Sequence, residues 1–142
     1  MSEPDKLLTL SVFPPGLDHP EGVAWGPDGR IYAGGEAGQV YRLNLADNTC
    51  ETLANTGGFA LGLAHDADCN VYVCDQGRKE IVKVTPTGEV SAYCGGNDAQ
   101  KMRVPNYPVF DADGNLYVSD SGDWGAKNGF IWRIRPGGQS DI

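Results

Sequence analysis

The sequence predicts an all-β protein built from β-propeller blades, with three four-stranded blades in the chain. Two observations predict this class. The 142 residues include 20 glycines and 9 prolines without a collagen period, which indicates short strands joined by tight turns and argues against a helical bundle. In addition, one pattern of strand, turn and strand returns about every 40 residues, a spacing typical of propeller blades.

Three segments share this pattern: a short apolar strand, a turn with an aligned aspartate, and a second strand with a tyrosine. They begin at residues 21, 61 and 106, so the repeat lengths are 40 and 45 residues. The aligned residues are Asp28, Asp68 and Asp113 in the turns and Tyr32, Tyr72 and Tyr117 in the strands. Asp followed by Gly supplies the left-handed backbone of a two-residue hairpin turn. Self-similarity of this kind predicts a repeat architecture.

Further strands complete each blade. A third strand is expected at 39–45, 80–85 and 130–135, and a fourth in the first two units only, at 50–53 and 89–93. We expect no fourth strand in the third unit, because the sequence stops soon after Pro136-Gly-Gly. The apolar segment 7–13 precedes the first unit and is the candidate for that missing outer strand. The single domain 1–142 then contains blades at about 21–58, 59–96 and 105–142.

Three blades leave two sheet faces that only further blades can cover. Two chains arranged head to tail would form a six-bladed ring with C2 symmetry. In this homodimer each N-terminal strand would complete the third blade of the partner. The alternative is that the chain is a truncated product or a piece of a longer propeller. The strand order favours the half-propeller, because an extra outer strand at one end matches a missing one at the other.

Composition narrows the choice of partners and location. The net charge is −8 and no basic run occurs, so nucleic acid and anionic membranes are poor partners. The first residues lack the basic and apolar regions of a signal peptide. Cys50, Cys69, Cys74 and Cys94 lack the spacing of a zinc site, and without a secretion signal we expect reduced thiols and a cytoplasmic protein.

Residues that can carry chemistry gather on one rim of the predicted blades. Glu21, Leu61 and Asn106 each begin an inner strand beside the central channel, and Asp75 and Asp120 end second strands on the same rim. The extra length of the third repeat falls in a loop on that rim, at 121–129, and long loops on one side usually mark a binding side.

Each of these residues also has a structural interpretation. Glu21 fits a solvated carboxylate, Asn106 a turn cap, and Asp75 and Asp120 turn formation. Trp124, in the long loop, fits either stacking on a ligand or packing across the rim. His65 aligns with Trp25 and Phe110 as a position for packing between blades, so the two histidines do not indicate a Ser-His-Asp site.

Two segments resemble the gluconolactonase family, which includes regucalcin and luciferin-regenerating enzyme. They are His19-Pro-Glu-Gly-Val-Ala-Trp with its Pro-Asp-Gly turn, and Pro105-Asn-Tyr-Pro-Val-Phe-Asp-Ala-Asp-Gly-Asn-Leu-Tyr-Val-Ser-Asp120. The likeness covers nearly the whole chain but only the N-terminal half of a family member. The Pro-Asp-Gly turns are shared with strictosidine synthase and bacterial peptide-repeat propellers. The resemblance implies a six-bladed propeller with a divalent cation in its channel, usually calcium, with zinc or magnesium as alternatives.

The resemblance also implies roles for individual residues. Glu21 matches the family's metal-binding glutamate, and Asn106 matches an asparagine beside the metal and the substrate. Arg103 corresponds to a substrate-contacting arginine with one residue more between it and the asparagine, and Asp120 to an acidic strand end. Tyr107 departs from the family, which has Asp or Gly there. The ligands of the fourth and fifth blades have no counterpart, although a second copy of Glu21 and Asn106 would replace some of them.

The expected function is therefore metal-dependent hydrolysis of a small lactone or ester by a dimer of half-propellers. Such hydrolysis needs a metal that polarises the carbonyl and a carboxylate that acts as base, for which Glu21 and Asp120 are the candidates. Arg103, Asn106 and Trp124 are the candidates for substrate contacts. The alternative is a half-propeller without enzymatic activity, either a binding or assembly module or an inactive fragment.

Overall fold

The computed structural model describes residues 11–13 and 16–142. Across these residues the chain forms twelve β-strands and no helix. The described residues therefore include no helix long and apolar enough to cross a membrane. The strands form three separate antiparallel sheets, each with its four strands in chain order. The predicted all-β architecture of three four-stranded propeller blades is confirmed.

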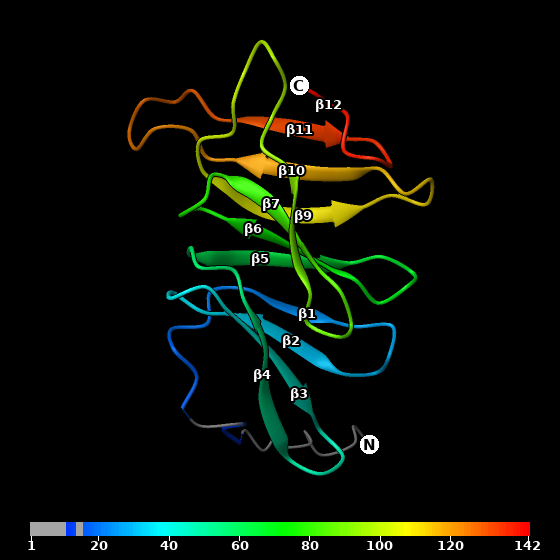
Figure 1. Ribbon diagram of the computed structural model, residues 1–142. Coiled ribbons are helices and arrows are strands. Elements are labelled where there is room, and N and C mark those ends of the chain that lie inside the picture. The colour runs from blue at the N-terminus through cyan, green and yellow to red at the C-terminus, as the bar shows by residue number, and fades with distance from the viewer. Residues whose placement is uncertain (1–10, 14–15) are drawn as a thin grey trace, which may run out of the picture.

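Each sheet is one blade. Blade 1 contains β1 (Val23–Trp25), β2 (Ile31–Gly34), β3 (Gln39–Asn44) and β4 (Thr49–Asn55). Blade 2 contains β5 (Ala60–His65), β6 (Val71–Asp75), β7 (Glu80–Val84) and β8 (Val90–Cys94). Blade 3 contains β9 (Pro105–Phe110), β10 (Leu116–Asp120), β11 (Phe130–Ile134) and β12 (Ser140–Asp141). Figure 1 shows the blades stacked face to face, with the inner strands β1, β5 and β9 next to one another.

Blade 3 has a fourth strand, so the expectation of only three strands was wrong. The two residues of β12 pair with Arg133 and Ile134 of β11. A tight turn at Pro136–Gly138 reverses the chain, with the N–H of Gly138 donating to the carbonyl of Arg135. The turn at Thr85 in blade 2 has the same hydrogen bond from Gly88, so the repeat already contained the signal for this strand.

The predicted N-terminal outer strand is not part of a described sheet. Its residues 7–10 lie outside the described residues, and 11–13 form no strand. Phe13 instead packs, together with Leu17, against the outer side of blade 1, where Ala33 and Leu43 are buried. The outer position of blade 3, which the N-terminal strand of a partner was expected to fill, is occupied by β12, so the missing strand that motivated the exchange is not missing; the exchange itself stays an untested prediction.

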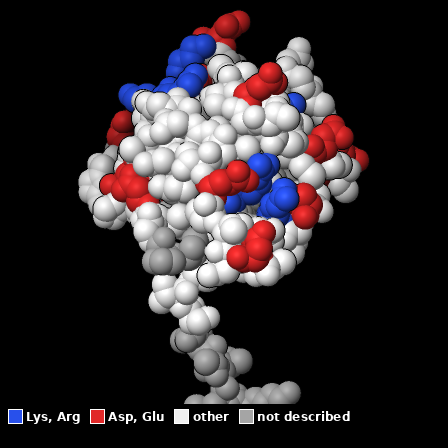
Figure 2. Space-filling model, turned by 60° about the horizontal axis from the view of Figure 1, so that its bottom comes forward, with Lys and Arg blue, Asp and Glu red and all other residues white. Residues whose placement is uncertain are grey.

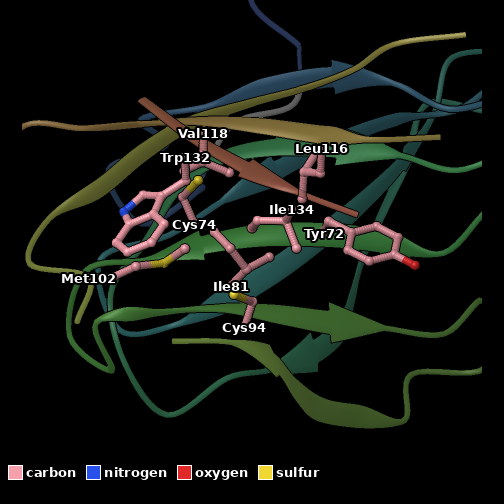
Figure 3. Packing of buried hydrophobic residues seen from close by; sticks show 9 residues of the cluster. All are labelled: Tyr72, Cys74, Ile81, Cys94, Met102, Leu116, Val118, Trp132 and Ile134. Atoms are coloured by element: carbon pink, nitrogen blue, oxygen red, sulfur yellow. The ribbon is translucent and has the colours of Figure 1, made fainter. Parts of the chain in front are cut away.

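Two apolar cores join the blades. The first lies between blades 1 and 2, where Tyr32 and Val40 meet Val71, Val73 and other apolar residues of blade 2. The second lies between blades 2 and 3, and Figure 3 shows its side chains, listed here: Tyr72, Cys74, Ile81, Cys94, Met102, Leu116, Val118, Trp132 and Ile134. Burial of each large apolar side chain contributes about 1.5–3 kcal/mol. The stability of the stack therefore depends on apolar contacts between neighbouring sheets, because the faces of the sheets must be covered by other sheets.

Two glycines allow the inner strands to approach one another. A side chain at Gly22 would collide with the carbonyl oxygen of Leu61 in the next blade. A Cβ atom at Gly62 would lie 2.6 Å from the carbonyl oxygen of Asn106. Any larger residue at these two positions would push neighbouring inner strands apart. Blade 3 has Tyr107 at the equivalent position.

The turn between the first two strands of each blade is longer than the predicted two-residue hairpin. In blade 1 the N–H of Gly29 donates to the carbonyl of Gly26, and the N–H of Gly26 donates to Arg30. In each of these three turns one residue has a left-handed backbone: Gly29 (φ 77°), Cys69 (φ 64°) and Gly114 (φ 81°). One left-handed residue following a type I turn gives a three-residue loop with a bulge.

The left-handed position leads to a stability prediction for Cys69. A non-glycine residue is strained there, and Cys69 is a free thiol. We expect Cys69→Gly to raise the free energy of unfolding by about 0.5–1 kcal/mol. Gly29→Ala is the matched control and should lower it by about 1 kcal/mol, because the space around Gly29 is open and only backbone strain is added. Urea unfolding of both variants measures the difference, and a less stable Cys69→Gly variant would contradict the prediction.

His65 lies in the joint between blades 1 and 2 and packs edge-on against Tyr32, with ring centroids 4.4 Å apart. Its two ring nitrogens are buried and have no hydrogen-bond partner. Burial lowers the pKa of His65 from 6.5, although Asp28 and Asp66 act in the opposite direction. The expected packing role of this position is therefore what the structure shows.

The lowered pKa of His65 predicts a loss of stability in mild acid. Above 6.5 the imidazole is neutral in both the folded and the unfolded chain, so it adds no pH dependence. Below 6.5 the unfolded chain takes up a proton that the folded protein resists, and the free energy of unfolding falls. His65→Phe, which copies Phe110 of blade 3, should lose less stability between about pH 7 and about pH 5.5. Urea unfolding at both pH values tests this, and equal losses in the two proteins would count against it.

Candidate functional site

A pocket of about 620 Å³ opens on one rim of the stack, beside the inner strands. Glu21, Asn106 and Trp124, which the sequence nominated separately, all line it. The rim is the left edge of Figure 1, where the orange loop between β10 and β11 projects. Blade 2 contributes Leu61 and Gln76 to the lining. The structure thus brings together three of the five predicted site residues from segments about a hundred positions apart in the sequence.

The two predicted metal ligands are both exposed. Glu21 follows Pro20 just before β1, and Asn106 is the second residue of β9. The side-chain amide of Asn106 donates a hydrogen bond of 3.2 Å to the hydroxyl oxygen of Ser121. This bond holds the Asn106 side chain while its carbonyl oxygen has no partner among the described residues. The two predicted ligands therefore present one carboxylate and one amide oxygen to the pocket, which Asp123 and Gln76 also line.

The long loop that carries Trp124 is held by a small polar network. Asp123 accepts a hydrogen bond of 2.8 Å from the side-chain amide of Asn128, whose oxygen accepts the N–H of Asp123. Arg103 reaches the same carboxylate, with 3.0 Å between its Nη1 and Oδ2 of Asp123. Arg103 does not line the pocket but lies next to Val104, which does. Trp124 is fully exposed at the tip of this anchored loop.

Asp120 lies beneath the pocket, 2% exposed. Its Oδ2 accepts the N–H of Arg103 at 2.9 Å and the indole N–H of Trp132 at 3.2 Å. Its Oδ1 accepts the N–H groups of Val104 at 2.9 Å and Gly122 at 3.0 Å. Four donors occupy the four acceptor positions of a carboxylate. Asp120 therefore fixes the start of β9 and the start of the long loop, and it does not reach into the pocket.

The pKa of Asp120 agrees with its role in holding the backbone. Burial raises the pKa of its carboxyl, but the backbone N–H groups of Arg103, Val104 and Gly122 lower it by more, so the net pKa lies below the ordinary value. A carboxylate stabilised in this way is a weak proton acceptor. Of the two predicted bases, only Glu21 is exposed to the pocket.

Asp75 is the equivalent carboxylate of blade 2 and is fully buried. Its Oδ1 accepts the N–H groups of Phe59 and Arg78, both at 2.9 Å. Its Oδ2 has no hydrogen-bond partner, because Val82 stands where Trp132 donates to Asp120. Asp75 and Asp120 thus both tie the beginning of an inner strand to the end of a second strand, as the alternative turn-forming interpretation expected.

Within the described part of the chain, one group of three ionisable side chains could hold a metal by itself. It consists of Asp18, His19 and Glu36 on the surface of blade 1, with ligand atoms within 4.8 Å of one another. The Nδ1 of His19 is 3.0 Å from Asp18 and 3.6 Å from Glu36, and the hydrogen bond to Asp18 raises the pKa of His19. Glu21 and Asn106 are not members of this group.

The surface is acidic, in keeping with the net charge of −8. In Figure 2 acidic side chains are scattered over the visible face, and the basic ones form small groups beside them. All four cysteines are free thiols, and burial strongly raises the pKa of Cys74. Neither observation points to a second reactive centre.

Comparison with known proteins places this geometry among the propellers. A family model described as strictosidine synthase-like, N-terminal, matches residues 5–43. The strictosidine synthase-like 6 protein of Arabidopsis thaliana is 31% identical over 110 residues, which are 73% of this chain and 29% of that protein. A gluconolactonase from Xanthomonas campestris superposes with a TM-score of 0.75 at 21% identity, over 88% of this chain and 47% of that one.

The chain has the fold of the gluconolactonase-like β-propellers. A second gluconolactonase-type structure matches 91% of this chain and 52% of its own with a TM-score of 0.73 at 16% identity. Virginiamycin B lyase from Staphylococcus aureus matches 86% and 40% with a TM-score of 0.64 at 18% identity. The resemblance predicted from the sequence is confirmed at the level of the fold. The gluconolactonase-like chain spans about half the length, or less, of these relatives.

Sequence reasoning missed the residues that support the pocket. Asp123 and Ser121 position Arg103 and Asn106, and Gln76 extends the lining into blade 2. Ser121 and Asp123 stand inside the long loop, so the loop itself was the available signal. Their partners could not be identified, because each is 15 to 20 residues away along the chain.

The contacts of Asp120 predict that its removal destabilises the protein. Asp120→Ala would remove the acceptor of four N–H groups, and those of Gly122 and Trp132 are buried. We therefore expect the free energy of unfolding to fall by about 3 kcal/mol or more. Asp123→Ala, which removes an exposed carboxylate of the same loop, should cost about 1 kcal/mol or less. Urea unfolding compares the two variants. An Asp120→Ala variant as stable as Asp123→Ala would contradict the role of Asp120 in holding the backbone.

Proposed function

We propose that the chain is a half-propeller that pairs with a second copy into a six-bladed ring and hydrolyses a small lactone or ester with a divalent cation, calcium in the first place. The observation that carries this proposal is that Glu21, just before the first inner strand, and Asn106, in the third, line one pocket. The gluconolactonase-like fold supports the reaction class. Two copies, each spanning 47–52% of a gluconolactonase chain, supply about one ring.

The donor atoms fit a hard cation in kind. Calcium prefers six to eight oxygen ligands from carboxylates, carbonyl groups and water. One chain offers the carboxylate of Glu21 and the unpartnered amide oxygen of Asn106 in the pocket. In a C2-symmetric ring the second copy would add the same pair, and water or substrate would complete the shell. The ring is therefore required for a full site, and the proposal of metal binding depends on the proposal of the dimer.

The residues of the pocket divide the chemistry between them. The bound cation would polarise the ester carbonyl and lower the pKa of the attacking water. The exposed Glu21 carboxylate is suited to accept the proton of that water. Arg103, which Asp123 holds next to the pocket, is suited to bind the oxygens of the substrate. The exposed Trp124 is suited to stack its ring on a ring face of the substrate.

One observation favours a second candidate function, a binding or assembly module without enzymatic activity. Blade 2 presents the apolar Leu61 where a further ligand would be needed, and Asp120 is fully engaged by N–H donors. Of the predicted residues, only Glu21 then remains as a base, and the Asp123 carboxylate that also lines the pocket is already bound by Arg103 and Asn128. A half-propeller of this kind would keep the ring and the pocket but not the reaction. The free thiols fit the cytoplasmic location that we propose for either function.

Thermal unfolding tests the metal site. At a calcium concentration about 100 times the dissociation constant, binding stabilises the folded state by about 2.7 kcal/mol, a rise in Tm of about 5–10 °C for a domain of this size. Glu21→Gln should abolish this rise. Glu36→Gln, in the separate Asp18–His19–Glu36 group, is the matched control and should preserve it. A Tm that does not change with calcium, zinc or magnesium would remove the metal site from the proposal.

A panel of sugar lactones, acyl lactones and aryl esters then separates the two candidate functions. The hydrolase predicts calcium-dependent turnover that Glu21→Gln lowers by about 100-fold or more, because the variant loses both a metal ligand and the proposed general base. A dimer that binds calcium and hydrolyses nothing on the panel would support the binding module.

A further inference from the structure

Each blade has two faces, which we call front and back. The front face turns toward the preceding blade and the back face toward the following one. In the described part of the chain, the front face of blade 1 and the back face of blade 3 have no neighbouring blade (Figure 1). Phe13 and Leu17 cover only part of the front face of blade 1. Among the described residues, these faces carry six exposed large apolar side chains, which are Val23, Trp25, Tyr107, Val109, Ile131 and Ile142.

The two joints inside the chain follow one rule. A tyrosine on the back face packs edge-on against an aromatic ring of the next blade. Tyr32 meets His65 with centroids 4.4 Å apart, and Tyr72 meets Phe110 with centroids 5.1 Å apart. Each tyrosine also pairs across its sheet with a basic residue, Arg42 for the first and Lys83 for the second. The rule therefore specifies a tyrosine and a cation on one face and an aromatic ring on the other.

One of the two uncovered faces carries a tyrosine with a basic neighbour, and the other carries an aromatic ring at the matching position. On the back face of blade 3, Tyr117 pairs with Arg133 across the sheet, and both line a shallow pocket of about 250 Å³ with Ile131. On the front face of blade 1, Trp25 occupies the repeat position of His65 and Phe110 and is 63% exposed. Among the described residues, Tyr117 therefore has no aromatic ring packed against it from a following blade, and Trp25 has no tyrosine packed against it from a preceding blade.

We infer that the back face of blade 3 binds the front face of blade 1 of a second copy, with Trp25 of one copy packed against Tyr117 of the other. This inference rests on the proposed half-propeller dimer and specifies its interface. Side-chain sizes support a second copy of the chain as the occupant. Val109 on the back face is larger than Ala24 and Ala64 at the internal joints, whereas Val23 and Ala33 on the front face are smaller than their counterparts in blade 2.

Tyr107 makes this joint different from the internal ones near the channel. It occupies the position of Gly22 and Gly62, where a Cβ atom would collide with the next inner strand. The inner strands at the joint between copies must therefore stand farther apart than those inside the chain. Tyr107 is 56% exposed and fills part of the wider gap. The joint thus combines the aromatic contact of the repeat with a wider opening at the rim, next to Asn106.

Solution mass tests the interface directly. Light scattering should give about twice the chain mass of 15.2 kDa for the wild type. Trp25→Glu and Tyr117→Lys should each be monomeric at concentrations where the wild type is dimeric. An equimolar mixture of the two variants should return to the dimer mass, because one joint is then native and the other pairs Glu with Lys. Thermal unfolding of each variant alone confirms that it is folded.

Two further variants complete the test. Val90→Ser removes an exposed apolar side chain from the outer strand of blade 2 and should leave the dissociation constant unchanged. Tyr107→Gly restores the repeat glycine and should tighten the dimer about tenfold or more. A monomeric wild type overturns the inference, also when Tyr107→Gly dimerises, since Tyr107 then blocks the joint. Single variants that dimerise like the wild type, or a mixture that stays monomeric, overturn it as well.

The outcome can be separated from that of the proposed function. If Trp25→Glu and Tyr117→Lys dissociate the dimer and calcium has no effect on Tm, the proposed interface is supported and the proposed metal site is rejected. If calcium raises Tm through Glu21 while the wild type is monomeric, the interface falls and the metal site stands.

Discussion

The whole structure depends on apolar faces that pack blade against blade. A four-stranded sheet of this size has two faces and cannot bury both by itself, so each blade is stable only between neighbours. The joint between blades 2 and 3 shows how this is done, with Trp132 and Ile134 packed onto Ile81 and Cys74. The tyrosines add direction to this packing, because an edge-on contact such as that of Tyr72 with Phe110 fixes how one sheet lies on the next.

This stacking also creates the pocket. The inner strands approach closely only because Gly22 and Gly62 carry no side chain, and that approach brings the residues before β1 and inside β9 to one rim. Buried carboxylates then fix the rim. Asp75 and Asp120 each accept backbone N–H groups from the start of an inner strand or the loop before it, so the chain leaves each blade in a fixed direction. The exposed side chains of Glu21, Asn106 and Trp124 stand on this rigid base.

The division of work among the acidic residues follows from burial. A carboxylate surrounded by N–H donors, as Asp120 is, becomes part of the backbone framework, and its lowered pKa reflects the donors that hold it. An exposed carboxylate such as Glu21 keeps its lone pairs for a cation, water or substrate. The gluconolactonase-like fold is thus present, and Glu21 and Asn106 are exposed at its rim.

The sequence by itself determined the repeat. The spacing of Asp28, Asp68 and Asp113 and the alternation of apolar residues gave three sheets in the right order, because strand period and turn chemistry are local properties. It also brought Glu21 and Asn106 to one rim, since repeat positions map onto equivalent places. Only the tertiary structure decided which carboxylates are buried and that Asp123 holds Arg103. These features depend on contacts between residues far apart in the chain, whose geometry no local pattern specifies.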